Sequence, residues 1–132
     1  MAEMFTVEII TPDRIFYTGE VEFLEFATVA GEIGVYKKHI PTTTVLAPGV
    51  VILHEGGETK KAAVHGGFAE ILPDRVTVLA EIIEWPEEID EQRAKDAAER
   101  ARRRLGAHNP ETDVFRAEAA LKRALTRIQA LK

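Results

Sequence analysis

The sequence of 132 residues contains no cysteine, so no disulfide can form. It also has no apolar run near the ~20 residues that a transmembrane helix needs. The N-terminal residues 1–5 lack both the basic start and the long apolar stretch of a signal peptide. With 45% hydrophobic and 30% charged residues, the composition is that of an ordinary globular protein. We therefore expect a soluble protein of the cytosol.

The sequence also lacks the signatures of several chemical functions. There is no Gly-x-x-x-x-Gly-Lys-Ser/Thr loop, and no acidic pair is placed to hold Mg²⁺ beside a nucleophile. No aromatic residues are interleaved with the arginines at 102–104, which argues against nucleic-acid binding. No pair of histidines has the spacing of metal ligands on a helix: His39, His54, His65 and His108. We expect neither a metal site nor an enzyme.

A change of periodicity between Trp85 and Asp90 is the main positive feature. The residues before it alternate with the two-residue period of β-strands, whereas those after it follow the 3.6-residue period of helices. Charge changes at the same place: 1–87 has an acidic excess and 88–132 a basic one, within a net charge of −5. The sequence therefore predicts two domains, 1–85 and 86–132.

Short strands separated by turn residues fill the first part. Turns are expected at 11–14, at the reversal 30–34, at Pro48-Gly49, at the hairpin loop 55–58 and at Pro73-Asp74. No helical pattern intervenes, which is typical of a β-sandwich or flattened barrel of eight to ten strands. The strands are expected at 5–10, 15–17, 21–26, 50–53, 62–65, 66–71 and 75–83.

The second part predicts a helical hairpin. The first helix should run from Asp90, its N-cap, to Leu105, with Gly106 in the left-handed position after it. Asn109 should cap a second helix with Pro110 in its first turn. This helix carries an apolar stripe of Val114, Ala117, Leu121, Leu125 and Ile128.

The inner face of the first helix is mostly alanine, at 94, 97, 98 and 101. Each alanine removes about one methyl from water, on the order of 0.8 kcal/mol. Such a hairpin opens easily. Two explanations remain open: alanine fits a tight interface, or low adhesion serves a switch.

Antiparallel pairing of the two helices gathers arginines at the open end of the hairpin. Asp90 should lie opposite Arg127, and Arg93 opposite Arg123 or Ala124, while Arg100 faces Arg116. Arg93, Arg123 and Arg127 then repel one another unless an anion lies among them, and guanidinium groups match phosphate oxygens well. The alternative is that Asp90 is only an N-cap and that these arginines pair with Glu84, Glu87, Asp90 or solvent.

Several spaced motifs resemble the epsilon subunit of bacterial F-type ATP synthase. They are Gly-Glu-Ile-Gly-Val-Tyr at 31–36, His-Ile-Pro at 39–41, Pro48-Gly49, Gly-Gly-Phe-Ala-Glu-Ile at 66–71, Arg-Val-Thr-Val-Leu-Ala at 75–80 and Ala-Leu-Lys-Arg-Ala-Leu at 120–125. The likeness covers nearly the whole chain. It implies an α+β protein in two domains, a ten-stranded β-sandwich followed by an antiparallel two-helix regulatory hairpin.

The resemblance also implies partners and a mode of action. The sandwich of such a subunit docks on the gamma subunit and the rotor c-ring, which makes the protein peripheral on the cytoplasmic face of the membrane. The helices either fold against the sandwich or extend along gamma and block rotation in the hydrolytic direction, with the basic C-terminal helix meeting the catalytic beta subunits. Glu32 and His39 would face the rotor ring, unless they are ordinary solvated loop residues.

One motif implies a regulatory ligand. Ile89-Asp90-Glu91-Gln92-Arg93-Ala94 matches the pattern Ile/Leu-Asp-x-x-Arg-Ala, which binds ATP in Bacillus-like members. ATP would be sensed, with or without Mg²⁺, and would favour the folded hairpin. A stand-alone nucleotide sensor is the alternative. The implied ATP contacts are Glu84, Ile89, Asp90, Arg93, Ala94, Arg123 and Arg127, with weaker ones at Arg100 and Arg116.

Overall fold

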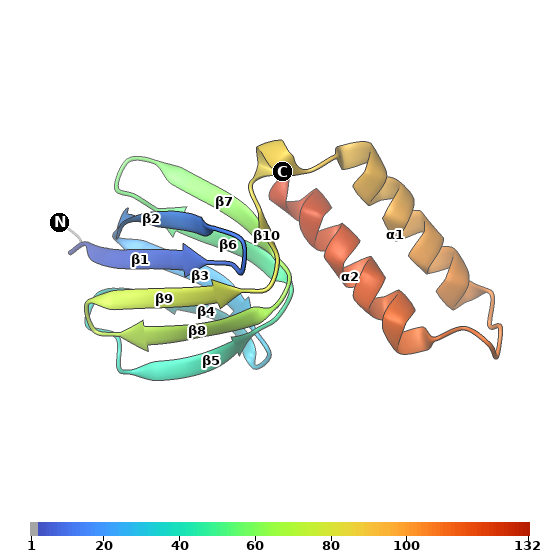
Figure 1. Ribbon diagram of the computed structural model, residues 1–132, viewed down its shortest axis with the longest axis horizontal. Coiled ribbons are helices and arrows are strands. Elements are labelled where there is room, and N and C mark those ends of the chain that lie inside the picture. Colours follow the sequence, from blue (N-terminus) through green and yellow to red (C-terminus); the bar gives the residue numbers. More distant parts are fainter. Residues whose placement is uncertain (1–2) are drawn as a thin grey trace.

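The computed structural model describes residues 3–132, in which ten β-strands precede two α-helices (Figure 1). The strands form two facing layers, and the helical hairpin lies at one end of them. The prediction of a β-sandwich followed by two helices is confirmed. The strands are β1 Phe5–Ile10, β2 Ile15–Val21, β3 Phe23–Thr28, β4 Gly31–Val35, β5 Thr42–Leu46, β6 Gly49–His54, β7 Thr59–Val64, β8 Gly67–Leu72, β9 Arg75–Ala80 and β10 Ile83–Glu84.

One continuous hydrogen-bonded path connects the layers in the order β10-β7-β6-β3-β5-β8-β9-β1-β2, with β4 paired to β3. β1 runs parallel to β9 and antiparallel to β2. In several strands alternate residues point inward, as Phe5, Val7 and Ile9 of β1 show. The core is aliphatic with a few aromatic rings, and its largest fully buried side chains are Phe26, Ile9, Leu24, Leu53 and Ile71.

The strand predictions were wrong at three places. The segment 30–34, expected to be a turn, contains most of β4, whose two glycines are more typical of a turn than of a strand. Gly34 leaves room for a neighbouring ring, because a Cβ there would lie 2.8 Å from the ring of Phe23. β5 was missed because its threonines give no apolar alternation. The strand expected at 75–83 breaks after Ala80, where the Glu81 N–H donates to Gly66 O and β10 moves over to pair with β7.

The helices are α1 Glu91–Gly106 and α2 Val114–Ala130. Asp90 caps α1 as predicted and accepts a hydrogen bond from the Arg93 N–H at 3.0 Å. The prediction that Asn109 caps the second helix is wrong. Its side chain accepts from the Glu111 N–H within the loop, and Asp113 caps α2 instead by accepting from the Arg116 N–H at 3.1 Å.

The end of α1 also differs from the prediction. Gly106 remains in the helix, and the left-handed residue of the loop is His108, with a φ of 51°. The apolar stripe of α2 is only partly inward. Ala117 is buried, but Val114 is 52% and Leu125 37% exposed.

Alanines make most of the contact between the two helices. Ala94, Ala98 and Ala101 of α1 are buried, as are Ala117, Ala124 and Ala130 of α2. α2 also packs against β6 and β7, so it lies between α1 and the sandwich (Figure 1). The hairpin is therefore attached to the sandwich mainly through α2.

The linker between the domains is fixed to the sandwich. The short 3₁₀ helix Pro86–Glu88 follows Trp85, whose ring stacks on Phe16 at 4.3 Å between centroids. Trp85 thus packs the linker against the sandwich. Arg14 donates twice to Glu88, at 2.8 and 2.9 Å, and the Trp85 N–H donates to the same carboxylate. These hydrogen bonds lower the pKa of Glu88, and the bond from Arg14 has the largest effect.

Gly67→Ala tests the turn between β7 and β8. Gly67 has a φ of +124°, and a Cβ there would lie 2.1 Å from the Leu79 carbonyl oxygen. We expect a loss of roughly 2–4 kcal/mol in the free energy of unfolding, because backbone strain and overpacking each cost about 1–3 kcal/mol. Urea unfolding followed by circular dichroism measures it. Gly57→Ala, in open space, is the control, and equal stability of the two variants would contradict the argument.

Arg14→Gln tests the attachment of the linker. We expect the pKa of Glu88 to rise toward its ordinary 4.5, as observed by NMR titration of the side-chain carboxyl carbon. Because the folded-state pKa is lowered, the stabilisation by this carboxylate is present above pH 4.5 and is lost as the pH falls below that value. Lys95→Gln, which removes the surface partner of Glu91, should leave Glu88 unchanged. An unaltered pKa of Glu88 in Arg14→Gln would refute this role.

Candidate functional site

A cavity of about 350 Å³ lies at the base of the hairpin, where β10, the linker, α1 and α2 meet. Most of the residues that the sequence implied for ATP line it. Two further lining residues, Glu88 and Ala97, were not predicted. The lining residues are Glu84, Glu88, Asp90, Arg93, Ala94, Ala97, Arg100 and Arg127.

The helical period explains why these side chains share one wall. Asp90, Arg93, Ala97 and Arg100 recur at intervals of three or four, so they lie on one face of α1. Alanines at 94 and 97 leave room between the arginines. Arg127 enters from the end of α2 because the helices are antiparallel, which brings it beside the start of α1.

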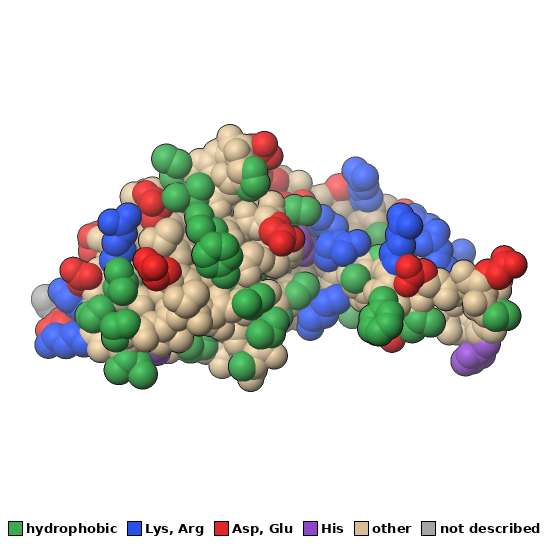
Figure 2. All heavy atoms as spheres, turned by 60° about the horizontal axis from the view of Figure 1, so that its bottom comes forward, with side chains coloured by type: hydrophobic (Ala, Val, Ile, Leu, Met, Phe, Trp, Pro, Cys, Tyr) green, Lys and Arg blue, Asp and Glu red, His purple; other side chains and the backbone are tan. Residues whose placement is uncertain are grey.

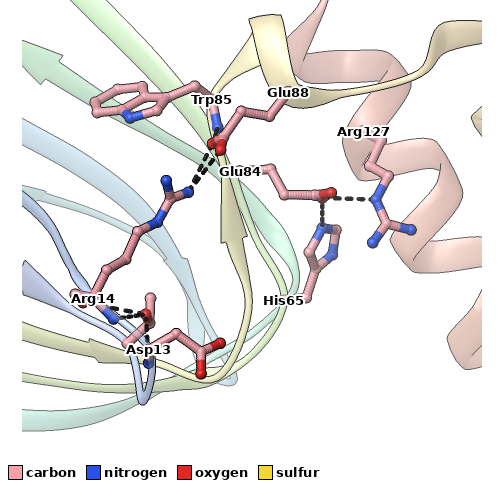
Figure 3. A network of polar contacts seen from close by, with 8 residues as sticks. Asp13, Arg14, His65, Glu84, Trp85, Glu88 and Arg127 are labelled. Atoms are coloured by element: carbon pink, nitrogen blue, oxygen red, sulfur yellow. Dashed lines mark hydrogen bonds and ion pairs between the residues drawn. The ribbon is translucent and has the colours of Figure 1, made fainter.

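The carboxylates of the cavity are already engaged. Glu84 Oε1 accepts from Arg127 Nε at 2.7 Å, and Glu88 is held by Arg14 (Figure 3). Asp90 caps α1. The alternative explanation expected the arginines to pair with Glu84, Glu87, Asp90 or solvent. Among residues 3–132, the only such ion pair formed is that of Arg127 with Glu84. Neither Arg93 nor Arg100 takes part in an ion pair with these residues. The three arginines and three carboxylates that line the cavity balance in formal charge. The guanidinium groups of Arg93 and Arg100 have no ion-pair partner among residues 3–132, so their donors suit a phosphate.

His65 was missed as a member of this site. Its side chain is 0% exposed, and Nε2 lies 3.0 Å from the same Glu84 oxygen that Arg127 contacts. Burial is the main cause that lowers the pKa of His65; Arg127 and Arg123 act in the same direction, and the hydrogen bond with Glu84 opposes them. The imidazole is thus neutral near pH 7 and donates from Nε2. The sequence signal was a histidine that ends the buried run Ala62–Val64.

The other implied ATP residues lie elsewhere. Ile89 is half-buried in the extended link to α1, and Arg123 is half-buried on α2, where its charge acts on His65. Arg116 does not line this cavity. It lies with Arg104 and Asp113 in a separate hollow near the loop between the helices.

Glu32 and His39 lie at opposite ends of β4. Glu32 is exposed near the start of the strand, beside a groove that α2 also lines. His39 follows the strand, and its Nδ1 lies 2.7 Å from the carbonyl oxygen of Ile40. Contact of these residues with a rotor ring stays a prediction.

An apolar row on the outer face of the sandwich was also missed. The strand registers place five side chains next to one another across β5, β8, β9, β1 and β2, and Figure 2 shows apolar side chains gathered over the sandwich and basic ones over the helices. The signal was an apolar residue at one outward position of each of these strands. The row is Val45, Phe68, Leu79, Ile10 and Ile15, of which all but the half-buried Ile10 are exposed.

Residues 3–132 contain neither a membrane-spanning helix nor a cluster of metal-binding side chains. No helix is long and apolar enough to cross a membrane. In the same residues, no three side chains of the metal-binding types come together.

Comparisons with known proteins agree with the two-part architecture. The family model for the beta-sandwich domain of the ATP synthase Delta/Epsilon chain matches residues 4–86, and the model for its long alpha-helix domain matches 87–132. The ATP synthase epsilon chain of Caldanaerobacter subterraneus subsp. tengcongensis is 45% identical over 98% of this chain and 94% of its own length. That of Bacillus velezensis is 43% identical over 92% of each.

Solved structures show the same fold. A chain of the Euglena gracilis mitochondrial ATP synthase, from a complex of OSCP, F1 and c-ring, has a TM-score of 0.85 at 27% identity, over 98% of this chain and 82% of its own. A chain from the central stalk and c-ring of the Tetrahymena thermophila enzyme has a TM-score of 0.63 at 12% identity, with 98% of each covered, and shows the fold alone. The chain belongs to the family of ATP synthase epsilon chains, as its motifs predicted.

Proposed function

We propose that this chain is a non-catalytic subunit of the central stalk that restrains ATP hydrolysis through a mobile helical hairpin, and that ATP stabilises the folded hairpin. The observation that carries the proposal is the cavity at the hairpin base, which Arg93, Arg100 and Arg127 line together. Its walls come from the sandwich, the linker and both helices. A ligand held by all of them binds only while the hairpin is folded.

The sandwich suits a docking role. Its outer face carries the apolar row from Val45 to Ile15, which is the kind of surface that a protein partner covers. We assign this face to the gamma subunit, with the rotor c-ring as the other neighbour of the sandwich. Similarity to a chain solved in a complex of F1 and c-ring supports this position. The subunit would then be peripheral, on the cytoplasmic face of the membrane.

The cavity suits a nucleotide in size and charge. Its volume of about 350 Å³ falls within the roughly 300–1,000 Å³ of small-molecule sites. Arg93, Arg100 and Arg127 face it, and guanidinium groups bind phosphate oxygens with two donors at once. We place the triphosphate near these arginines and leave open whether Mg²⁺ accompanies it.

Inhibition follows from the other state of the hairpin. The positive side chains of α2 are partly held at the cavity when the helices are folded, as the pair of Arg127 with Glu84 illustrates. Once extended, they are free to meet acidic surfaces of the catalytic beta subunits. Low ATP would favour this extended, inhibitory state, and high ATP the folded, permissive one.

Calorimetric titration with ATP and ADP, with and without Mg²⁺, tests the site. We expect wild-type binding in the micromolar to millimolar range and a loss of at least about tenfold in Arg93→Gln, since a hydrogen bond to a charged group contributes roughly 1.5–3 kcal/mol. Arg116→Gln is the matched control because Arg116 lies in a different hollow. No heat from the wild type, or equal losses in both variants, would exclude this site.

Hydrolysis by the assembled ATP synthase tests the regulatory role. We expect inhibition to weaken as ATP rises, and Arg93→Gln to shift this dependence to higher ATP by the factor found in its affinity. Asp90→Ala is less suitable, because Asp90 also caps α1 and loss of a cap costs about 0.5–2 kcal/mol. An ATP dependence identical to the wild type would refute the switch. Failure to co-purify with a gamma subunit would favour a stand-alone sensor.

A further inference from the structure

His65 has a place that the nucleotide site does not by itself explain. It follows β7 directly, its side chain is fully buried, and its Nε2 donates to Glu84 Oε1 at 3.0 Å. The same oxygen accepts from Arg127 Nε at 2.7 Å. One carboxylate oxygen thus receives a donor from the sandwich and a donor from α2 (Figure 3).

The atom that Arg127 uses matters for phosphate binding. A guanidinium group has five N–H donors, of which Nε carries one and the two terminal nitrogens carry four. Glu84 contacts Nε, and Figure 3 shows the terminal nitrogens turned away from the carboxylate. This grip fixes the plane of the guanidinium group and leaves its terminal nitrogens to a phosphate.

Glu84 is in turn oriented by His65. A carboxylate on a side chain with three torsions is not fixed by one ion pair alone, and Glu84 is 25% and Arg127 29% exposed. The imidazole of His65 is held by burial and cannot turn to solvent. Hydrogen-bond partners of this kind orient a functional group without touching the ligand.

We propose that His65 is a positioning residue of the phosphate site, acting through Glu84 to present the terminal nitrogens of Arg127 to the nucleotide. This role rests on the proposed binding of ATP. It requires the neutral imidazole with its proton on Nε2, which agrees with burial and with the nearby cations Arg123 and Arg127. Buried Nδ1 has no hydrogen-bond partner within the described residues.

Two substitutions separate the donor of His65 from its volume. His65→Leu fills the space without a donor, and His65→Gln restores a neutral donor near the position of Nε2. His54→Ala is the matched control, because His54 makes a similar pair with Glu25, with 2.7 Å between Nε2 and Oε2, outside the cavity. Far-UV circular dichroism and urea unfolding establish that each variant is folded.

The first readout needs no nucleotide. The Arg127 Nε–H should give a slowly exchanging signal in the ¹H–¹⁵N spectrum of the wild type and of His65→Gln, and a faster exchanging one in His65→Leu. Glutamine keeps a donor but not the imidazole ring, so a slowly exchanging signal in His65→Gln would assign the effect to the donor. An Arg127 signal unchanged in His65→Leu would overturn the proposal.

The second readout is the affinity for ATP by calorimetry. We expect His65→Leu to weaken binding by about tenfold, as removal of one hydrogen bond to a charged group does, and His65→Gln to stay within about threefold of the wild type. In a Glu84→Gln background the same His65→Leu change should have little further effect, because residues that act through one another are not additive. An equal loss in both backgrounds would show that His65 does not act through Glu84.

The outcomes distinguish this role from the proposed function. If the wild type binds ATP and His65→Leu binds it equally well, only the role of His65 fails. If the wild type does not bind ATP, nucleotide sensing fails and this role fails with it. Should His65→Leu not fold, the Arg127 signal and ATP affinity of His65→Gln decide, since loss of both in a folded variant with a neutral donor contradicts the proposal.

Discussion

The carboxylate of Glu84 joins the two parts of the molecule. Glu84 lies on β10, the last strand of the sandwich, and its carboxylate accepts hydrogen bonds from His65 of the sandwich and from Arg127 of α2. The remaining contacts between the parts are mainly those of α2 with β6 and β7. The Glu84 Oε1 atom and the packing of α2 on β6 and β7 together fix how the end of α2 lies against the sandwich, beside the cavity that α1 completes.

The other contacts of the hairpin are weak by comparison with a normal core. Its seam is made of alanines, each contributing on the order of 0.8 kcal/mol for its methyl group. The linker is the opposite case, since Trp85 stacks on Phe16 and Glu88 is bound by Arg14. Any opening of the hairpin would thus begin after Glu88, in the extended residues Ile89 and Asp90. The alanine seam is compatible both with tight packing and with switching.

Local pattern predicted much of this structure. Alternation and turn residues located most strands, and the 3.6-residue period with Asp90 located α1 and its arginine face. Two site residues that the pattern missed depend on contacts with other segments of the chain. Glu88 enters the site through Arg14, 74 residues away in sequence, and His65 through Glu84. The other failures are local. Glycines conceal β4 and threonines conceal β5. Asn109 closes a turn within the loop, so Asp113 caps α2 in its place.

A weak seam and an arginine-lined cavity fit together energetically. A ligand that binds only the folded hairpin stabilises it by about 2.7 kcal/mol at a hundred times its dissociation constant. That is comparable with burying a few methyl groups, so a seam of leucines would leave the folded state insensitive to such a ligand. In the proposed switch, alanines at 94, 98 and 101 would keep the balance between folded and extended helices within the range that a nucleotide can shift. Under the proposed function, the alanines of the seam and the arginines of the cavity would act as two parts of one regulatory device.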